Sequence, residues 1–311
     1  FAGGQSNPTY KLTAESGTYV LRRKPPGQLL QSAHAVDREF KAMSALQNTS
    51  VPVATPLALC EDDDVIGSMF YLMDYLDGDI YWNAALPELD PERRSAMYDN
   101  MNQLLADLHN VDVEAVGLSG YGKPGNYFAR QLDRWTKQYR ASETQRLEPV
   151  ETLISYLEAN LPEDDGQVCL VHGDFRLDNM MFAKGGEEII ALLDWELSTL
   201  GHPYADLAYQ CMQWRLPSSA AIPGLGDVDR EALGIPSEAE YVRRYCERRG
   251  IDAIPDWEFY LAFSFFRLAA ILQGVYKRAL DGNASNTAAK SLGAMTDPLA
   301  AMGVAVAEHG A

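Results

Sequence analysis

The sequence is poor in cysteine and short of basic residues. Its 311 residues include four cysteines, and no two of them form a Cys-x-x-Cys pair, so we expect reduced thiols and no disulfide framework or structural metal site. The 26 Lys and Arg residues against 44 Asp and Glu residues give a net charge of -18. This balance argues against a nucleic-acid partner, because phosphate recognition depends on clustered cations.

A long uninterrupted apolar run is also missing. The most apolar stretch, residues 259–276, contains Ser264, Arg267 and Gln273, so it predicts a buried helix and no membrane partner. No signal peptide is visible at the start, and with the reduced thiols this favours a cytoplasmic protein. Only Phe1 and Ala2 precede the glycine pair Gly3–Gly4, so we expect a strand to precede the numbered sequence.

The chain divides by pattern into two predicted lobes. Residues 1–78 predict a small lobe in which a hairpin, a helix capped by Ser32 and two further strands follow one another. Residues 79–311 predict a larger, mainly helical lobe with two short strands. The expected strands are 9–13, 17–23, 168–171 and 189–193, with two more in the stretches PLALCEDD (56–63) and GSMFYLMDYL (67–76). The expected helices include 91–110, 126–140, 150–160 and most of 203–302.

Polar residues interrupt the apolar stretch VHGDFRLDNMMF, residues 171–182. Asp174 and Asn179 follow a predicted strand with the spacing His-x-Asp-x-x-x-x-Asn, which is the spacing of the protein-kinase catalytic loop. Twenty residues after Asp174, Asp194 ends the apolar strand IIALLD. Each acid alone is typical of a cap or turn, but the paired motifs favour a reaction centre whose hard oxygen atoms suit Mg²⁺.

The motifs HGDFRLDNMMF and ALLDWELSTLGHPYADLA resemble the aminoglycoside phosphotransferase and choline kinase-like family. The resemblance implies an α+β, protein-kinase-like bilobal fold, with an N-terminal antiparallel sheet lobe carrying one helix and a larger, mainly helical C-terminal lobe. It also implies that Asp174 is the catalytic base and that Asn179 and Asp194 are magnesium ligands. His172 would brace the loop, and Asp206 would hydrogen-bond the backbone of the catalytic loop.

Two segments of the first lobe are expected to hold the nucleotide. By family analogy the stretch GGQSNPTY covers the phosphates through Gly3, Gly4, Ser6 and Asn7, since glycines allow a close backbone approach and the polar side chains donate hydrogen bonds. The stretch MFYLMDYLDG matches the hinge, where backbone groups of a segment such as Asp74–Leu76 would bind a purine, so ATP and GTP both stay open.

The strand TYVLRRKP should supply the cation that pairs with the phosphates. Aligning Tyr19–Leu21 with the kinase pattern Val-Ala-Ile-Lys places Arg22 where kinases have lysine, and Lys24 is the alternative. Glu39, on the following helix, is the expected ion-pair partner.

These residues predict phosphoryl transfer from ATP or GTP, with Mg²⁺ as cofactor, to a hydroxyl group of a small molecule. A small molecule is favoured over a protein because no Ala-Pro-Glu segment follows Asp194. Trp257, Tyr260 and Arg267 are candidates for the acceptor cleft, with core and surface roles as the competing interpretation.

Three alternatives to this function stay open. The stretches GGQSNPTYKL and LSTLGHPYADLAY resemble the kinase-like domain fused to acyl-CoA dehydrogenases, and this resemblance implies a hydroxyacyl thioester as the acceptor. The first alternative is an aminoglycoside or an amino-alcohol as the acceptor. A pseudokinase that acts as a nucleotide-binding interaction module would keep the fold and lose the chemistry. A metal-dependent hydrolase would use His172, Asp174 and Asp194 but would need further histidine ligands.

Overall fold

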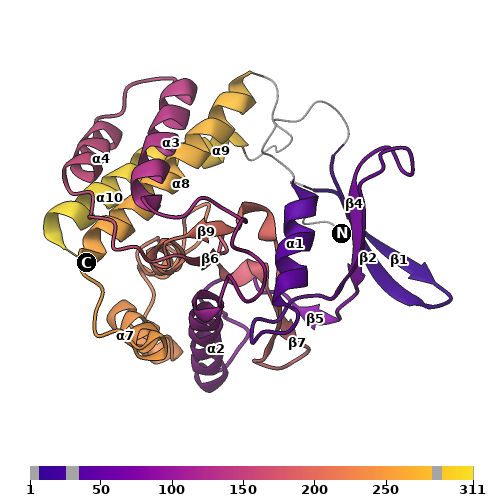
Figure 1. The fold of residues 1–311 in the computed structure, drawn as a ribbon. Coiled ribbons are helices and arrows are strands. Elements are labelled where there is room, and N and C mark those ends of the chain that lie inside the picture. The colour runs from indigo at the N-terminus through magenta and orange to yellow at the C-terminus, as the bar shows by residue number, and fades with distance from the viewer. Residues whose placement is uncertain (1–6, 26–34, 282–288, 311) are drawn as a thin grey trace. The chain divides into compact units, whose positions relative to one another are not determined.

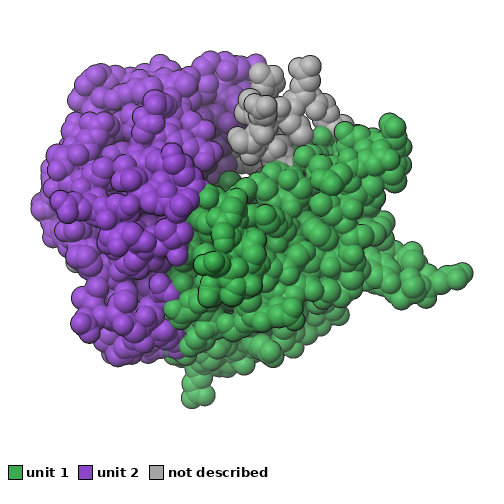
Figure 2. Space-filling model, in the orientation of Figure 1, with its two compact units in different colours: residues 1–122, 169–200 green, residues 123–168, 201–311 purple. Residues whose placement is uncertain are grey.

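The computed structural model describes residues 7–25, 35–281 and 289–310, so Gly3, Gly4, Ser6 and the predicted cap Ser32 lie outside the described residues. The chain forms two compact units, one of residues 1–122 and 169–200 and one of residues 123–168 and 201–311 (Figure 2). The predicted lobe boundary after residue 78 lies inside the first unit. The first unit therefore holds the N-terminal sheet together with both segments that carry Asp174 and Asp194.

The first unit contains a four-stranded antiparallel sheet with the order β1-β2-β4-β3 (Figure 1). Its strands are β1 (Thr9–Ala14), β2 (Gly17–Arg23), β3 (Pro56–Cys60) and β4 (Phe70–Asp74). Helix α1 (Val36–Leu46) packs on β3 and β4. It buries Val36, Glu39, Met43 and Leu46, the spacing of one helical face, so a glutamate shares the apolar stripe.

Helix α2 (Pro91–Asn110) has the bounds that the sequence predicted. The side chain of Asp90 caps it by accepting a hydrogen bond from the Arg93 N–H, and Pro91 occupies the first turn, where its missing N–H costs nothing. The buried face of α2 packs against β6 (Cys169–Val171), the strand that leads into the motif of His172, Asp174 and Asn179.

Short strands frame the two motif segments of the first unit. Strand β6 pairs with β9 (Thr199–Gly201), and a three-stranded sheet has the order β5-β7-β8. The strands of this sheet are β5 (Gly78–Asp79), β7 (Met180–Ala183) and β8 (Ile189–Leu192). Strands β6 and β8 were expected, whereas β5, β7 and β9 were not, because two to four residues are too few to show an alternating pattern.

The second unit is helical, as predicted, and residues 215–229 form a loop without helix or strand. Its helices are α3 (Tyr127–Ser142), α4 (Glu148–Ala159), α5 (Tyr204–Cys211), α6 (Arg230–Leu233), α7 (Glu238–Arg249), α8 (Trp257–Leu280), α9 (Ala289–Gly293) and α10 (Thr296–His309). Helix α8 is the central element and packs against α3, α4, α5, α9 and α10 (Figure 1). It is long and apolar enough to cross a membrane, but 72% of its apolar window is buried inside the protein, as in a core helix.

All four cysteines are free thiols, as expected. Cys169, Cys211 and Cys246 are buried, and Cys60 is half-buried. Burial raises the pKa of the Cys211 thiol well above its usual value, so this side chain is an unreactive core residue.

Candidate active site

The motif His-x-Asp-x-x-x-x-Asn begins directly after β6 and ends in the 3₁₀ turn η1 (Leu177–Asn179). The amide nitrogen of Asn179 donates to the backbone oxygen of Asp174 at 2.9 Å and to its carboxylate Oδ2 at 3.0 Å. The expected base and the expected metal ligand are therefore in direct contact. Because the amide nitrogen of Asn179 holds Asp174, the amide oxygen is the atom that Asn179 can offer to a metal ion.

His172 connects this loop to the segment that carries Asp194. Its ring is fully buried, Nδ1 accepts the N–H of Asp174 at 3.3 Å, and Nε2 lies 2.8 Å from the backbone oxygen of Leu193. Because Nδ1 accepts a hydrogen bond and the carbonyl oxygen of Leu193 can only accept one, the proton of a neutral His172 ring is assigned to Nε2. The Leu193 N–H donates in turn to the backbone oxygen of Asn179 at 2.8 Å, so two links tie the segments together.

Gly173, between His172 and Asp174, has a left-handed backbone with φ of +84°. A Cβ atom at this position would lie 2.7 Å from the backbone oxygen of Leu197, in the turn after Asp194. Both the conformation and the close approach require glycine. The sequence motif contains this residue, but only the structure shows what it contacts.

We expect Gly173→Ala to destabilise the protein more than a matched Gly117→Ala change. Gly117 shares the left-handed conformation, with φ of +75°, but has no atom within 4 Å of the added Cβ. Gly117→Ala should cost about 1–2 kcal/mol of backbone strain, and Gly173→Ala about 1–3 kcal/mol more for the forced contact. Urea unfolding of both variants measures the difference, and equal losses would contradict the close approach at Leu197.

Asp194 follows β8 and also has a left-handed backbone, with φ of +65°. The next residue begins the 3₁₀ turn η2 (Trp195–Leu197), which the buried Trp195 anchors through an Nε1–H hydrogen bond of 2.9 Å to the backbone oxygen of Leu192. The turn presents the Asp194 carboxylate, whose Oδ1 accepts a hydrogen bond of 2.6 Å from Arg22.

Arg22 occupies the position that the sequence assigned to the phosphate-binding cation. Its Nε lies 2.9 Å from Glu39 Oε2, an ion pair in which the N–H is not aligned for a hydrogen bond. Lys24, the alternative, lies 3.9 Å from Asp37 on a more exposed part of the surface. The structure therefore pairs Arg22, and not Lys24, with Glu39.

Glu39 is buried on α1 among polar partners. Tyr71 donates to its Oε2 at 3.1 Å and Asn7 donates to its Oε1 at 2.8 Å. Burial raises the pKa of Glu39 to about 7, against the opposing effect of Arg22 and with a further rise from the nearby Asp194 carboxylate. Tyr71 was not predicted as a site residue, because a tyrosine in a strand usually indicates packing alone.

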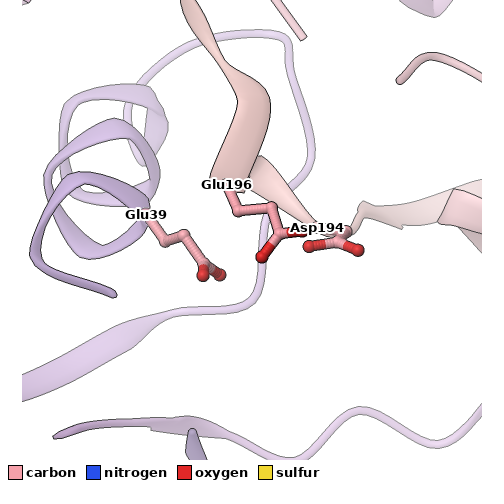
Figure 3. Close-up of side chains that lie close together, drawn as sticks. All are labelled: Glu39, Asp194 and Glu196. Carbon is pink, nitrogen blue, oxygen red and sulfur yellow. The ribbon is translucent and has the colours of Figure 1, made fainter. Parts of the chain in front are cut away.

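The structure adds Glu196 to the predicted set. Its Oε2 accepts a hydrogen bond of 3.3 Å from Asn7 and lies 3.9 Å from an Arg22 amino group. Carboxylate oxygens of Glu39, Asp194 and Glu196 lie within 4.8 Å of one another (Figure 3). The Asp-x-Glu spacing was visible in the sequence, but the 3₁₀ turn that directs both side chains to one place was not.

The donor set around Asp194 fits a divalent cation. Three carboxylates share a single arginine, which leaves local negative charge uncompensated. Hard oxygen ligands of this kind suit Mg²⁺. Asn7, expected to donate to phosphates, is fully buried, and its amide donates to two of these carboxylates.

The expected hinge residues lie at and beyond the end of β4. The Asp74 N–H donates to the backbone oxygen of Thr55 at 2.9 Å, and both Asp74 and Leu76 are half-buried. The backbone N–H of Asp74 is thus already used in a hydrogen bond within the first unit. The contacts of this segment with a purine stay a prediction.

The candidates of the second unit lie in separate environments. Asp206 is fully buried on α5. Tyr260 is buried in an aromatic cluster where its ring stacks on His202, which is a core position. Trp257 donates through Nε1 to Glu238 at 2.9 Å and lines a cavity of about 760 Å³. The Arg267 guanidinium lies over the Tyr209 ring at 5.0 Å and near the Trp135 ring at 5.7 Å.

Comparison with solved structures defines the class of the protein. A candidate aminoglycoside phosphotransferase from Ralstonia eutropha is 47% identical, with a TM-score of 0.91 over 98% of this chain and 91% of that one. A ternary complex of aminoglycoside phosphotransferase APH(4)-Ia with AMP-PNP and hygromycin B is 14% identical, with a TM-score of 0.65 over 99% and 93% of the two chains. The fold is the protein-kinase-like fold of the aminoglycoside phosphotransferases, as the sequence predicted.

The family follows from the sequence comparison. The model of the phosphotransferase enzyme family matches residues 1–262, and the chain belongs to this family. Mouse acyl-CoA dehydrogenase family member 10 is 53% identical over 301 residues, which cover 96% of this chain and 28% of the relative. The chain spans between 28% and 40% of the length of such curated relatives.

Proposed function

We propose that this chain transfers the γ-phosphoryl group of ATP or GTP to a hydroxyl group of a small molecule and uses Mg²⁺. The observation that carries the proposal is the contact of Asp174 with Asn179, tied through Leu193 to the segment of Asp194. Family membership supports it, and so does the nucleotide analogue in a structural neighbour of the same fold.

Each polar residue of this arrangement has a role in the proposed reaction. Asp174 orients the acceptor hydroxyl and takes its proton as the oxygen bonds to the γ-phosphorus, while the bond from this phosphorus to the β–γ bridging oxygen breaks and ADP or GDP leaves. Asn179 keeps the carboxylate of Asp174 in place, and with Asp194 it would hold Mg²⁺, which supplies charge neutralisation at the phosphates. Arg22 binds phosphate oxygens, and Glu39 positions Arg22 for this contact.

The acceptor that we favour is a hydroxyacyl thioester. The curated relatives carry the name acyl-CoA dehydrogenase, and this chain matches only part of each of them. A phosphotransferase segment in such a protein would share an acyl thioester with the remainder of the chain. Arg267, held over the Tyr209 and Trp135 rings, is the candidate for binding a carbonyl or anionic group of this acceptor.

An aminoglycoside or amino-alcohol is the second candidate acceptor. The observation in its favour is the Ralstonia eutropha structure, which is 47% identical and described as a candidate aminoglycoside phosphotransferase. The net charge of -18 would attract a cationic antibiotic, but this charge is spread over the chain and does not identify a binding site.

We expect ATP or GTP to raise the melting temperature only when Mg²⁺ is present. At a ligand concentration of 100 times Kd, binding stabilises the native state by about 2.7 kcal/mol, which a thermal-shift assay detects. A panel of hydroxyacyl thioesters, aminoglycosides and choline-like alcohols then identifies the acceptor by ADP or GDP release. The non-hydroxylated acyl thioester is the matched control and should release none.

The outcomes separate the proposed function from its alternatives. Nucleotide binding without phosphorylation of any acceptor would indicate a pseudokinase. The absence of a shift with both nucleotides, with and without Mg²⁺, would exclude the kinase function. Phosphorylation of an aminoglycoside in preference to a thioester would overturn the proposed acceptor and leave the proposed kinase function intact.

A further inference from the structure

Arg22 lies among three carboxylates at unequal distances. Its Nε is 2.9 Å from Glu39, and one amino group is 2.6 Å from Asp194 Oδ1 and 3.9 Å from Glu196 Oε2. The side chain of Arg22 is 12% exposed, so solvent screens these interactions only weakly. The same amino group therefore faces two carboxylates and is bound by the nearer one.

The contact with Asp194 conflicts with the proposed role of Asp194. A divalent cation on this carboxylate would stand within a few ångströms of the guanidinium, and the two positive charges repel each other in a weakly screened site. Glu39 holds only the Nε side of Arg22. The amino group of Arg22 thus needs another hydrogen-bond acceptor when Asp194 binds a metal ion.

Glu196 is already placed to be this acceptor. Asn7 holds Glu196 Oε2 at 3.3 Å and Glu39 Oε1 at 2.8 Å, so one buried amide fixes the spacing of the two glutamates. Helix α1, which carries Glu39, also packs against η2, which carries Glu196. A small rotation of the Arg22 amino group from Asp194 toward Glu196 keeps the guanidinium inside this frame.

We propose that Glu196 is a positioning residue that accepts Arg22 when Asp194 binds the metal ion. The inference rests on the proposed function. The carboxylate of Glu196 lies in the same cluster as that of Asp194, but in this arrangement it pairs with Arg22 and not with the metal. Its effect on metal affinity then passes entirely through Arg22. The Glu39–Arg22–Glu196 set then holds the cation beside the phosphates while Asp194 and Asn179 remain available for the metal.

A double-mutant cycle on metal affinity tests this inference. The probe is Mn²⁺, whose free concentration is read by electron paramagnetic resonance in the presence of AMP-PNP and without acceptor, so no turnover is needed. Glu196→Gln should raise the Kd for Mn²⁺ about 5- to 10-fold, because Arg22 then stays on Asp194. In the Arg22→Met background the same change should alter Kd less than 2-fold, since the competing cation is gone.

Two further variants keep the test decisive. Glu187→Gln removes a carboxylate that pairs with Arg93 at 2.5 Å, away from the predicted site residues, and should leave Mn²⁺ binding unchanged. If Arg22→Met does not fold, Arg22→Lys replaces it. A lysine ammonium cannot reach Glu39 and Glu196 at once as a guanidinium can, so the effect of Glu196→Gln should again shrink.

The results distinguish the inference from the function on which it rests. Equal weakening of Mn²⁺ binding by Glu196→Gln in both backgrounds would make Glu196 a metal ligand and overturn the inference. An unchanged Kd in the native background would overturn it as well, with the proposed function intact. The absence of Mn²⁺ binding by the unaltered protein would overturn both.

Discussion

Replacement of Asp174 by asparagine should reduce phosphoryl transfer about 10²- to 10⁴-fold, the range for loss of a general base, and leave nucleotide binding intact. Asparagine has nearly the same shape as aspartate, so the contact with Asn179 is disturbed little, but an amide cannot take the proton of the acceptor hydroxyl. The measurement is kcat with the best acceptor, together with the Mg²⁺-dependent thermal shift by ATP or GTP.

Asp178→Asn is the matched control for this change. Asp178 belongs to the same loop, and its carboxylate pairs with Arg176 at 2.6 Å and not with Asn179. We expect kcat of Asp178→Asn to stay within a few-fold of the native value. Asp174 is not the base if transfer by Asp174→Asn stays at the native rate.

Asp194→Asn should remove the dependence of nucleotide binding on Mg²⁺ and lower kcat by roughly 10²- to 10³-fold, as for the loss of one preorganised electrostatic group. Asparagine is the informative replacement because it tolerates the left-handed conformation that Asp194 adopts, with φ of +65°. The loss then reports the missing charge and not backbone strain. Thermal shifts with nucleotide at increasing Mg²⁺ concentrations measure it.

Asp256 offers a control in the same conformation. It has φ of +52° and precedes α8, so Asp256→Asn makes the same chemical change in a similar backbone. Nucleotide binding by Asp256→Asn should depend on Mg²⁺ in the same way as nucleotide binding by the native protein. If Asp194→Asn also keeps the native Mg²⁺ dependence, Asp194 is not a metal ligand.

Local patterns predicted the longer elements well. Helix α2 and strand β2 have the predicted bounds because each shows a strong signal, a capped apolar face in α2 and a run of β-forming residues next to a glycine turn in β2. The buried helix α8 was predicted from its apolar run. Strands β5, β7 and β9 were missed, since pairing with distant segments, and not local propensity, forms strands this short.

The candidate site likewise contains residues that the local sequence pattern predicted and residues that only the folded structure brings together. Asp174, Asn179 and Asp194 were predicted because their spacing along the chain reflects the local loop that carries each of them. Tyr71 and Glu196 were not, since their polar atoms acquire a role only through Glu39 and Arg22. For Asn7 the family analogy indicated a phosphate donor, while the structure shows a buried amide between two glutamates.

The sequence alone determined which residue types this protein has available for chemistry: an aspartate and an asparagine after one buried strand, an aspartate after another, and an arginine in a strand of the N-terminal sheet. Only the tertiary structure decided that Arg22, which was expected to pair with Glu39, also binds Asp194 and has Glu196 as its third neighbour. The physical reason is that a motif records the spacing of neighbours along the chain. The balance of charge in a buried site depends on side chains that folding brings together from segments far apart.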